Sequence, residues 1–173
     1  MPHGRALAFS IGGVPVRAVG SYEGLLRTAV VRMKDGERAY LDAFAVLIAD
    51  RFAFASPLVP LPTTPQRRAA RGFDQSVAIA ERVARACDVP MLSLLRKSGS
   101  AQHGRRREAR LLGPAFRVVD GPLPPRVTLL DDVCTTGGTI RAAVAALAAA
   151  GVRVDGTIVV ARTPETRPRG ERS

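Results

Sequence analysis

The chain has 173 residues, of which 46% are hydrophobic and 5% aromatic, and its formal net charge is +11. This length suits one compact domain with a core of its own and room for a short N-terminal appendage. No stretch approaches the roughly 18 uninterrupted apolar residues of a membrane span, and the start carries no secretory pattern. Two cysteines are too few for a disulfide framework or a zinc site. We therefore expect a cytoplasmic globular protein without a membrane span.

Arginine carries almost all of the positive charge, since Lys34 and Lys97 are the only lysines. A basic excess suits nucleic acid and also polyphosphate substrates, and a GC-rich genome would produce the same abundance of arginine and alanine. Aromatic residues are too scarce for a typical stacking platform for single strands. Nucleic-acid binding therefore stays open as an addition to the site described below.

Residues 1–52 are expected to form an N-terminal helical, hood-like segment. It contains a short strand and two helices, predicted over residues 13–20, 22–34 and 37–51. Apolar residues recur at helical spacing in both helices, which leaves Lys34 on the more solvent-exposed face of the first helix. Ser21 is the expected N-cap of that helix.

Strands and helices alternate through residues 53–163, the expected main domain. Strands are predicted over residues 56–62, 89–95, 115–119 and 153–161, with a further strand beginning at Val127. Helices are predicted over residues 74–87, with Asp74 as N-cap, and 139–150, with Gly151 as C-cap. This order predicts an α/β fold, a mostly parallel sheet flanked by helices, with ligands bound beyond the carboxyl ends of the strands. Residues 164–173 are expected to form a flexible basic tail.

The segment 127–139 reads VTLLDDVCTTGGT and carries the clearest functional signal. Its opening run, VTLL, has three apolar residues and one threonine and is typical of a strand buried on both faces. Asp131 and Asp132 follow, and ionised carboxylates accept hydrogen bonds from vicinal sugar hydroxyls. Next comes a loop with hydroxyls and open backbone N–H groups at a helix N-terminus, where phosphate binds; it consists of Thr135, Thr136, Gly137, Gly138 and Thr139. Together these features predict a site for a ribose 5-phosphate.

This segment resembles the phosphoribosyl pyrophosphate (PRPP) motif of type I phosphoribosyltransferases, which has an apolar run, two acids and a Thr/Gly-rich loop. The alternative is a glycine-rich turn beside a surface acidic pair. Two carboxylates at the end of a buried strand are costly without a ligand or partner, which favours the binding site. The chain has neither GxxxxGK[ST] nor a strand followed by GxGxxG.

Two basic segments accompany the motif. In residues 60–75, PLPTTPQRRAARGFDQ, three arginines precede a helix N-terminus, and guanidinium forks there suit a diphosphate. A solvated basic turn is the alternative. Residues 96–110, RKSGSAQHGRRREAR, lack periodicity, and a loop of this length is often a lid that excludes water from a reactive ribosyl cation. A mobile surface loop with a run of charge is the alternative there.

Three segments together resemble the ComF family of competence-associated, phosphoribosyltransferase-like proteins. They are SYEGLLRTAVVRMKDGER (21–38), PLPTTPQRRAARGFDQS (60–76) and the Thr/Gly-rich loop followed by the pair Ala161-Arg162. The likeness spans residues 13–162. Asp74 stands where the family usually has Asn, and Arg105 stands where it has Leu. Family members usually begin with a cysteine-rich zinc finger, which this chain has lost or which has been trimmed from its start.

The resemblance implies PRPP with Mg²⁺ as substrate, the metal being held mainly by diphosphate and ribose oxygens. It implies Asp131 and Asp132 as catalytic residues on the ribose hydroxyls, and loop 135–139 as the 5-phosphate cradle. The implied pyrophosphate and lid residues are Arg71, Arg96, Lys97, Gln102 and Arg110. The acceptor is not identified. The alternative is a non-catalytic PRPP-binding sensor or a DNA-uptake accessory, with DNA, a competence-machinery protein or a second copy of the chain as partner.

Overall fold

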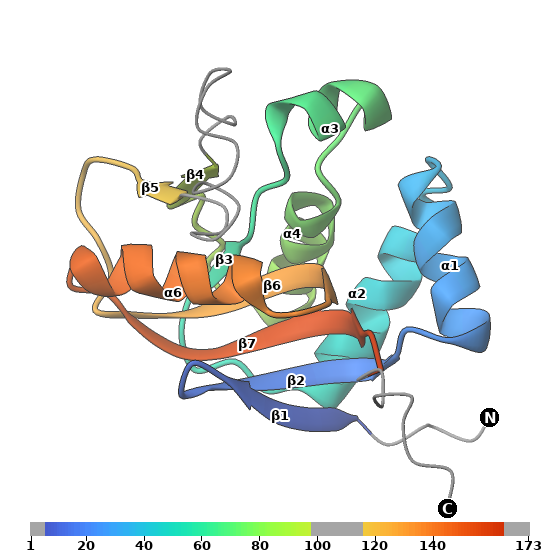
Figure 1. Cartoon of the computed structure of the whole chain (residues 1–173), viewed down its shortest axis with the longest axis horizontal. Helices are drawn as coiled ribbons and strands as arrows, with labels where there is room; N and C mark the ends of the chain where they lie inside the picture. The colour runs from blue at the N-terminus through green and yellow to red at the C-terminus, as the bar shows by residue number, and fades with distance from the viewer. Residues whose placement is uncertain (1–5, 98–115, 165–173) are drawn as a thin grey trace, which may run out of the picture.

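The main sheet of the computed structural model, which describes residues 6–97 and 116–164, has five strands in the order β1-β2-β7-β6-β3 (Figure 1). The strands are β1 (Leu7–Ile11), β2 (Val14–Ser21), β3 (Leu58–Pro60), β6 (Arg126–Cys134) and β7 (Arg153–Arg162). β2, β7, β6 and β3 pair in parallel, and β1 runs antiparallel to β2 at the edge. The predicted α/β class with a mostly parallel sheet is confirmed.

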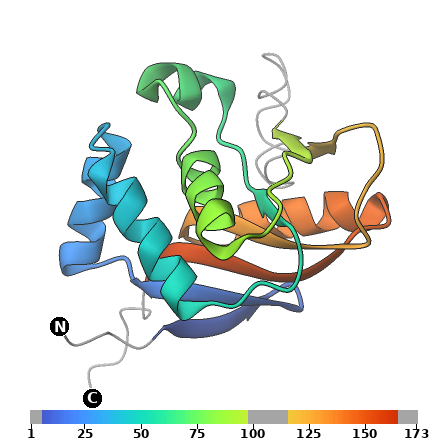
Figure 2. The same ribbon diagram turned by 180° about the vertical axis from the view of Figure 1, so that it is seen from behind.

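Helices cover both faces of the sheet, as the two opposite views show (Figures 1 and 2). One face is covered by α1 (Gly24–Lys34), α2 (Ala39–Arg51) and α4 (Gln75–Cys87), and the other by α6 (Gly138–Ala149). Met33, Ile48 and Ile79 pack in one core cluster with Leu130 of β6. Leu147 packs in a second cluster with Leu129 of the same strand. Neighbouring residues of β6 therefore enter opposite core layers, as expected for a strand buried on both faces.

Two predictions for residues 63–97 are wrong. The expected basic loop contains the helix α3 (Pro65–Arg71), which Thr64 caps by accepting the Arg67 N–H and which ends at Gly72 in the left-handed region. Residues 89–95 form no strand of the main sheet. The chain makes only an isolated bridge between Met91 and Leu58, and Pro60 of β3 has no N–H with which to continue the pairing. It then enters β4 (Leu95–Lys97), which pairs with β5 (Phe116–Val118) in a separate antiparallel sheet.

The N-terminal segment joins the main sheet through β2, which pairs with β7. The edge strand β1 was not predicted, although the Gly12-Gly13 pair that links it to β2 is a common hairpin turn. The N-cap of α1 is Glu23 and not Ser21. The division of the chain near residue 52 stays a prediction. Within the described ranges, no helix combines the length and apolar character needed to cross a membrane.

Candidate functional site

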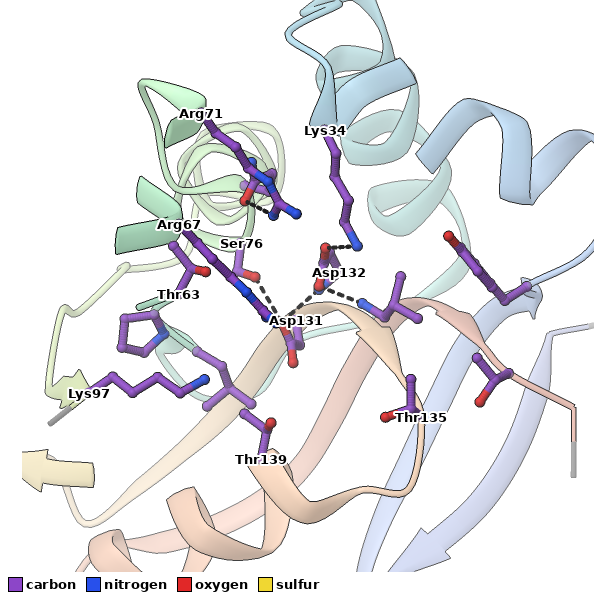
Figure 3. A pocket seen from close by; sticks show the side chains of 16 residues that line it. Lys34, Thr63, Arg67, Arg71, Ser76, Lys97, Asp131, Asp132, Thr135 and Thr139 are labelled. Carbon is purple, nitrogen blue, oxygen red and sulfur yellow. Dashed lines mark hydrogen bonds and ion pairs between the residues drawn. The ribbon is translucent and has the colours of Figure 1, made fainter. Parts of the chain in front are cut away.

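The two carboxylates of the acidic pair lie near the carboxyl end of β6 and have different partners (Figure 3). The Asp131 carboxylate accepts hydrogen bonds from Ser76 Oγ at 2.8 Å and from the Asp132 N–H at 2.9 Å. The Asp132 carboxylate lies 2.8 Å from Lys34 Nζ. Burial, and after it the charge of Asp132, raises the pKa of Asp131 well above its usual value, while the Ser76 hydroxyl opposes the rise. One acid of β6 is thus partly buried and hydrogen-bonded to Ser76 in the first turn of α4, and the other is held by a cation.

Both carboxylates line a cavity of about 350 Å³. Four cationic side chains also line it, namely Lys34, Arg67, Arg71 and Lys97. Figure 3 shows Arg67, Arg71 and Lys97 approaching from α3 and β4, whereas Lys34 descends from α1. The cavity therefore combines acceptors for hydroxyl groups with donors for an anion, which is the chemistry of a phosphorylated sugar.

The Thr/Gly-rich loop forms one wall of this cavity through Thr135 and Thr139. Gly137 is the N-cap of α6, with φ of 76°. A Cβ on Gly137 would lie 2.4 Å from Cδ1 of Ile11, so β1 packs directly against the loop. The first N–H groups of a helix have no partner within it, so the start of α6 offers donors to an anion beside the cavity.

The cationic wall is positioned by the segment between β3 and α4. Asp74 accepts hydrogen bonds from the Thr63 N–H at 2.7 Å and from the Val77 N–H at 3.4 Å. It therefore caps α4 as predicted and ties the loop after β3 to that helix. Arg71 donates from Nη1 to Gln75 Oε1 at 3.3 Å. Lys97 lies 5.6 Å from the centroid of the Phe116 ring, and burial lowers the pKa of its ammonium group.

The predicted site residues are only partly brought together. Asp131, Asp132, Thr135, Thr139, Arg71 and Lys97 line the cavity. Thr136 lines a neighbouring hollow. Gly137 and Gly138 contribute their backbone to the start of α6. Arg96 is exposed and lines a neighbouring hollow between α3, α4 and β4, which shares Lys97 with the cavity. Gln102 and Arg110 lie outside the described residues.

Arg67 at the cavity is one of the three arginines expected to suit a diphosphate, whereas Lys34 and Ser76, the two side chains that hold the acidic pair, were not predicted as site residues. Lys34 looked like part of the solvated face of its helix, yet its side chain is only 23% exposed against Asp132. The segment 21–38, which contains Lys34 and contributes to the resemblance to the ComF family, was the available signal. Ser76 follows the cap of α4, and nothing in the local sequence points it toward Asp131.

Comparisons with known proteins agree with this geometry. The family model described as "Phosphoribosyl transferase domain" matches residues 74–172, more than half of the chain. The chain is 29% identical over 147 residues to competence protein ComFC of Streptococcus pneumoniae, covering 82% of this chain and 65% of that protein. It is 27% identical over 136 residues to competence protein ComFC of Bacillus subtilis, covering 72% of this chain and 54% of that protein. The chain thus spans less than two thirds of the length of these curated relatives.

A solved structure supports the fold. The crystal structure of adenine phosphoribosyl transferase from Trypanosoma brucei, in complex with AMP, pyrophosphate and ribose-5-phosphate, superposes with a TM-score of 0.50 at 12% identity. The superposition covers 97% of this chain and 95% of that one. At this identity the likeness concerns the fold alone. The chain belongs to the phosphoribosyl transferase domain family, and its competence-protein relatives confirm the resemblance to the ComF family.

Proposed function

We propose that this protein binds PRPP in the cavity around Asp131 and transfers its phosphoribosyl group to an acceptor, with release of pyrophosphate. One observation carries the proposal: the acidic pair, the start of α6 and the cations of α3 and β4 meet at a single cavity. Vicinal hydroxyls need acceptors, a terminal phosphate needs N–H and hydroxyl donors, and a diphosphate needs cations. The cavity supplies all three.

In the proposed reaction a lone pair of the acceptor forms the new bond to C1 of the ribose. The C1–O bond breaks, its electron pair leaves with pyrophosphate, and the acceptor loses a proton. The carboxylates of Asp131 and Asp132 accept hydrogen bonds from the diol and stabilise the positive charge that develops on the sugar ring. Arg67, Arg71 and Lys97 stabilise the departing pyrophosphate.

The residues at the cavity fit an Mg²⁺ ion that arrives with PRPP. No group of three or more His, Cys, Asp or Glu side chains in the described ranges is arranged to hold a metal. Mg²⁺ is commonly held by one or two carboxylates together with substrate phosphates, and Asp131 and Asp132, which line the cavity, would supply such carboxylates. When bound, the ion would neutralise part of the charge of the pyrophosphate.

Calorimetric titration with PRPP and Mg²⁺ tests the binding step. Asp131→Asn and Asp132→Asn should each weaken PRPP binding by about 1.5–3 kcal/mol, the worth of a hydrogen bond to a charged group. Asp155→Asn is the matched control, because Asp155 pairs with Arg126 and Arg153 at the other end of β7. Unchanged PRPP affinity in both cavity variants would contradict the proposed roles.

Release of pyrophosphate distinguishes the enzyme from its alternatives. The protein is incubated with PRPP, Mg²⁺ and a panel of bases and amines. Binding without turnover across the panel would favour a PRPP sensor. A DNA-uptake accessory predicts DNA affinity that falls steeply with salt, and no DNA affinity at low ionic strength would remove that alternative. A role in competence, which the relatives support, and a cytoplasmic location stay parts of the proposal.

A further inference from the structure

Gln75, the first residue of α4, is a polar residue at the Asp131 cavity that has no role in the reaction proposed above. Only 2% of its surface is exposed, although it lines the cavity. It is hydrogen-bonded to Arg71, which is proposed to bind pyrophosphate, and it precedes Ser76, which donates to Asp131. Its carboxamide therefore lies at the wall on which the pyrophosphate of PRPP is expected.

One end of the Gln75 carboxamide has a partner. Its Oε1 accepts a hydrogen bond from Nη1 of Arg71 at 3.3 Å. A guanidinium group can only donate, so the amide oxygen and not the amide nitrogen must face Arg71. This contact decides which way round the carboxamide lies.

The other end of the carboxamide has no partner. Within the part of the chain that the structure describes, Nε2 of Gln75 and Oγ1 of Thr157 are the two buried side-chain atoms without a hydrogen bond. Such atoms are uncommon in folded proteins, because a buried donor has lost its hydration and gained nothing in return. A ligand oxygen that accepts the hydrogen bond recovers this loss, and a ligand without that oxygen does not. An unpaired donor at a cavity wall is therefore a means of selecting a ligand.

The surroundings of Nε2 favour an anionic acceptor. The arginines of α3 bring positive charge to this wall of the cavity (Figure 3). The Asp74 carboxylate at the same helix start accepts hydrogen bonds from the N–H groups of Thr63 and Val77, and it does not satisfy the Gln75 amide. Hydrogen bonds from N–H groups to phosphate oxygens are stronger than those to neutral acceptors.

We propose that Gln75 is a binding residue for the pyrophosphate group of PRPP, to which its amide nitrogen donates a hydrogen bond. This inference rests on the proposed function. The Arg71 guanidinium has five N–H donors, so it can keep its bond to Oε1 while it binds a phosphate oxygen. When Arg71 moves onto that phosphate, the carboxamide turns with it, and Nε2 leaves its buried position for the same phosphate.

Calorimetric titrations of Gln75→Met test this contact, because methionine keeps the length of the side chain and removes the carboxamide. Gln66→Met is the matched control, since Gln66 is an exposed residue of the neighbouring α3. Gln75→Met should bind inorganic pyrophosphate and PRPP, each with Mg²⁺, about tenfold more weakly or worse, as expected for a lost hydrogen bond to a charged group. It should bind ribose 5-phosphate as wild type does. Equal effects of Gln75→Met and Gln66→Met, or an equal loss with ribose 5-phosphate, would overturn the inference.

The stability of the ligand-free protein separates a donor kept for a ligand from a side chain needed by the fold. In urea denaturation the free energy of unfolding of Gln75→Met should equal or exceed that of wild type, because the unpaired donor is gone. A lower free energy of unfolding would mean that the carboxamide stabilises the folded protein itself, and it would overturn the inference.

A double variant separates contact with the ligand from an effect exerted through Arg71. Gln75→Met should weaken pyrophosphate binding further when it is added to Arg71→Gln. No further loss would mean that Gln75 only positions Arg71, which would overturn the proposed contact. If wild type does not bind PRPP, the proposed function fails, whereas pyrophosphate binding that depends on Gln75 would still support the donor at this wall. If wild type and Gln75→Met bind PRPP equally well, the proposed function stands and the inference fails.

Discussion

Gly137→Ala is expected to disturb the phosphate loop in two ways at once. The residue has φ of 76°, in the left-handed region. An added Cβ would also lie 2.4 Å from Cδ1, 3.0 Å from Cγ2 and 3.1 Å from Cγ1 of Ile11. Three atoms of one side chain are involved, so rotation of a single methyl group cannot relieve the contact. Either Ile11 or the loop must move.

The cost follows from these two effects. Alanine in the left-handed region costs about 1–2 kcal/mol, and overpacking a core costs about 1–3 kcal/mol. Ile11 belongs to the core cluster beneath α6 and is only 9% exposed, so it has little room to move. We expect Gly137→Ala to lower the free energy of unfolding by about 2–5 kcal/mol, a large part of the 5–15 kcal/mol typical of a domain.

Urea denaturation measures this loss, with Gly138→Ala as the matched control. At Gly138 the backbone is not left-handed, and the nearest atom to a new Cβ is Thr136 Oγ1 at 3.8 Å. Gly138→Ala should therefore be neutral or stabilising by about 0.5–1 kcal/mol, since glycine is unfavourable in a helix. Adding Ile11→Ala to Gly137→Ala should cost less than the two single changes predict, because the contact is gone. Equal losses in both glycine variants, or additive effects at positions 11 and 137, would refute the reasoning.

Three further predictions concern the side chains of the cavity. Because burial raises the pKa of Asp131, the folded protein binds this proton more tightly than the unfolded chain. The stabilisation that results is complete below the pKa of about 4 that Asp131 has in the unfolded chain. It is lost as the pH rises through the pKa that Asp131 has in the folded protein. Urea denaturation should therefore show that the free energy of unfolding of Asp131→Asn rises relative to that of wild type between about pH 4 and pH 7. Parallel pH profiles of the two proteins would contradict this. Lys34→Met leaves the Asp132 carboxylate, 17% exposed, without the cation at 2.8 Å. Its cost should lie between the roughly 1 kcal/mol of exposed ion pairs and the roughly 3–5 kcal/mol of buried ones. The double variant Lys34→Met with Asp132→Asn should be more stable in thermal unfolding than Lys34→Met alone. If it is not, loss of the ion pair is not the cause of the destabilisation by Lys34→Met. Arg71→Gln should weaken the binding of PRPP, measured by calorimetry, more than the binding of ribose 5-phosphate, because Arg71 lies on the side of the cavity proposed for pyrophosphate. The Arg68 side chain lines the hollow between α3, α4 and β4, so Arg68→Gln should leave both affinities unchanged. Equal effects of Arg71→Gln and Arg68→Gln would argue against a role of Arg71 in binding pyrophosphate.

The sequence alone determined the features that depend on neighbours along the chain. The apolar run of β6, the acidic pair and the Thr/Gly-rich loop are contiguous, so strand, carboxylates and helix start follow from one segment. The alternation of strands and helices likewise predicted the class of fold. Even so, α3 was missed although Thr64, Pro65 and Gly72 are ordinary signals for a cap, a first turn and an end, because the density of arginines was interpreted as a loop.

Only the tertiary structure decided which distant residues complete the site. Lys34 reaches Asp132 because Val30 and Met33 of the same helix are buried against the sheet, which fixes the direction of the lysine. Ile11 meets Gly137 because β1 folds back on β2 and lies beneath the loop. Periodicity records which face of an element is apolar, and it carries no information on which element that face will meet. The chemistry of the acid pair and its loop is therefore local, whereas the cation that balances Asp132 and the side chain that supports the loop come from packing.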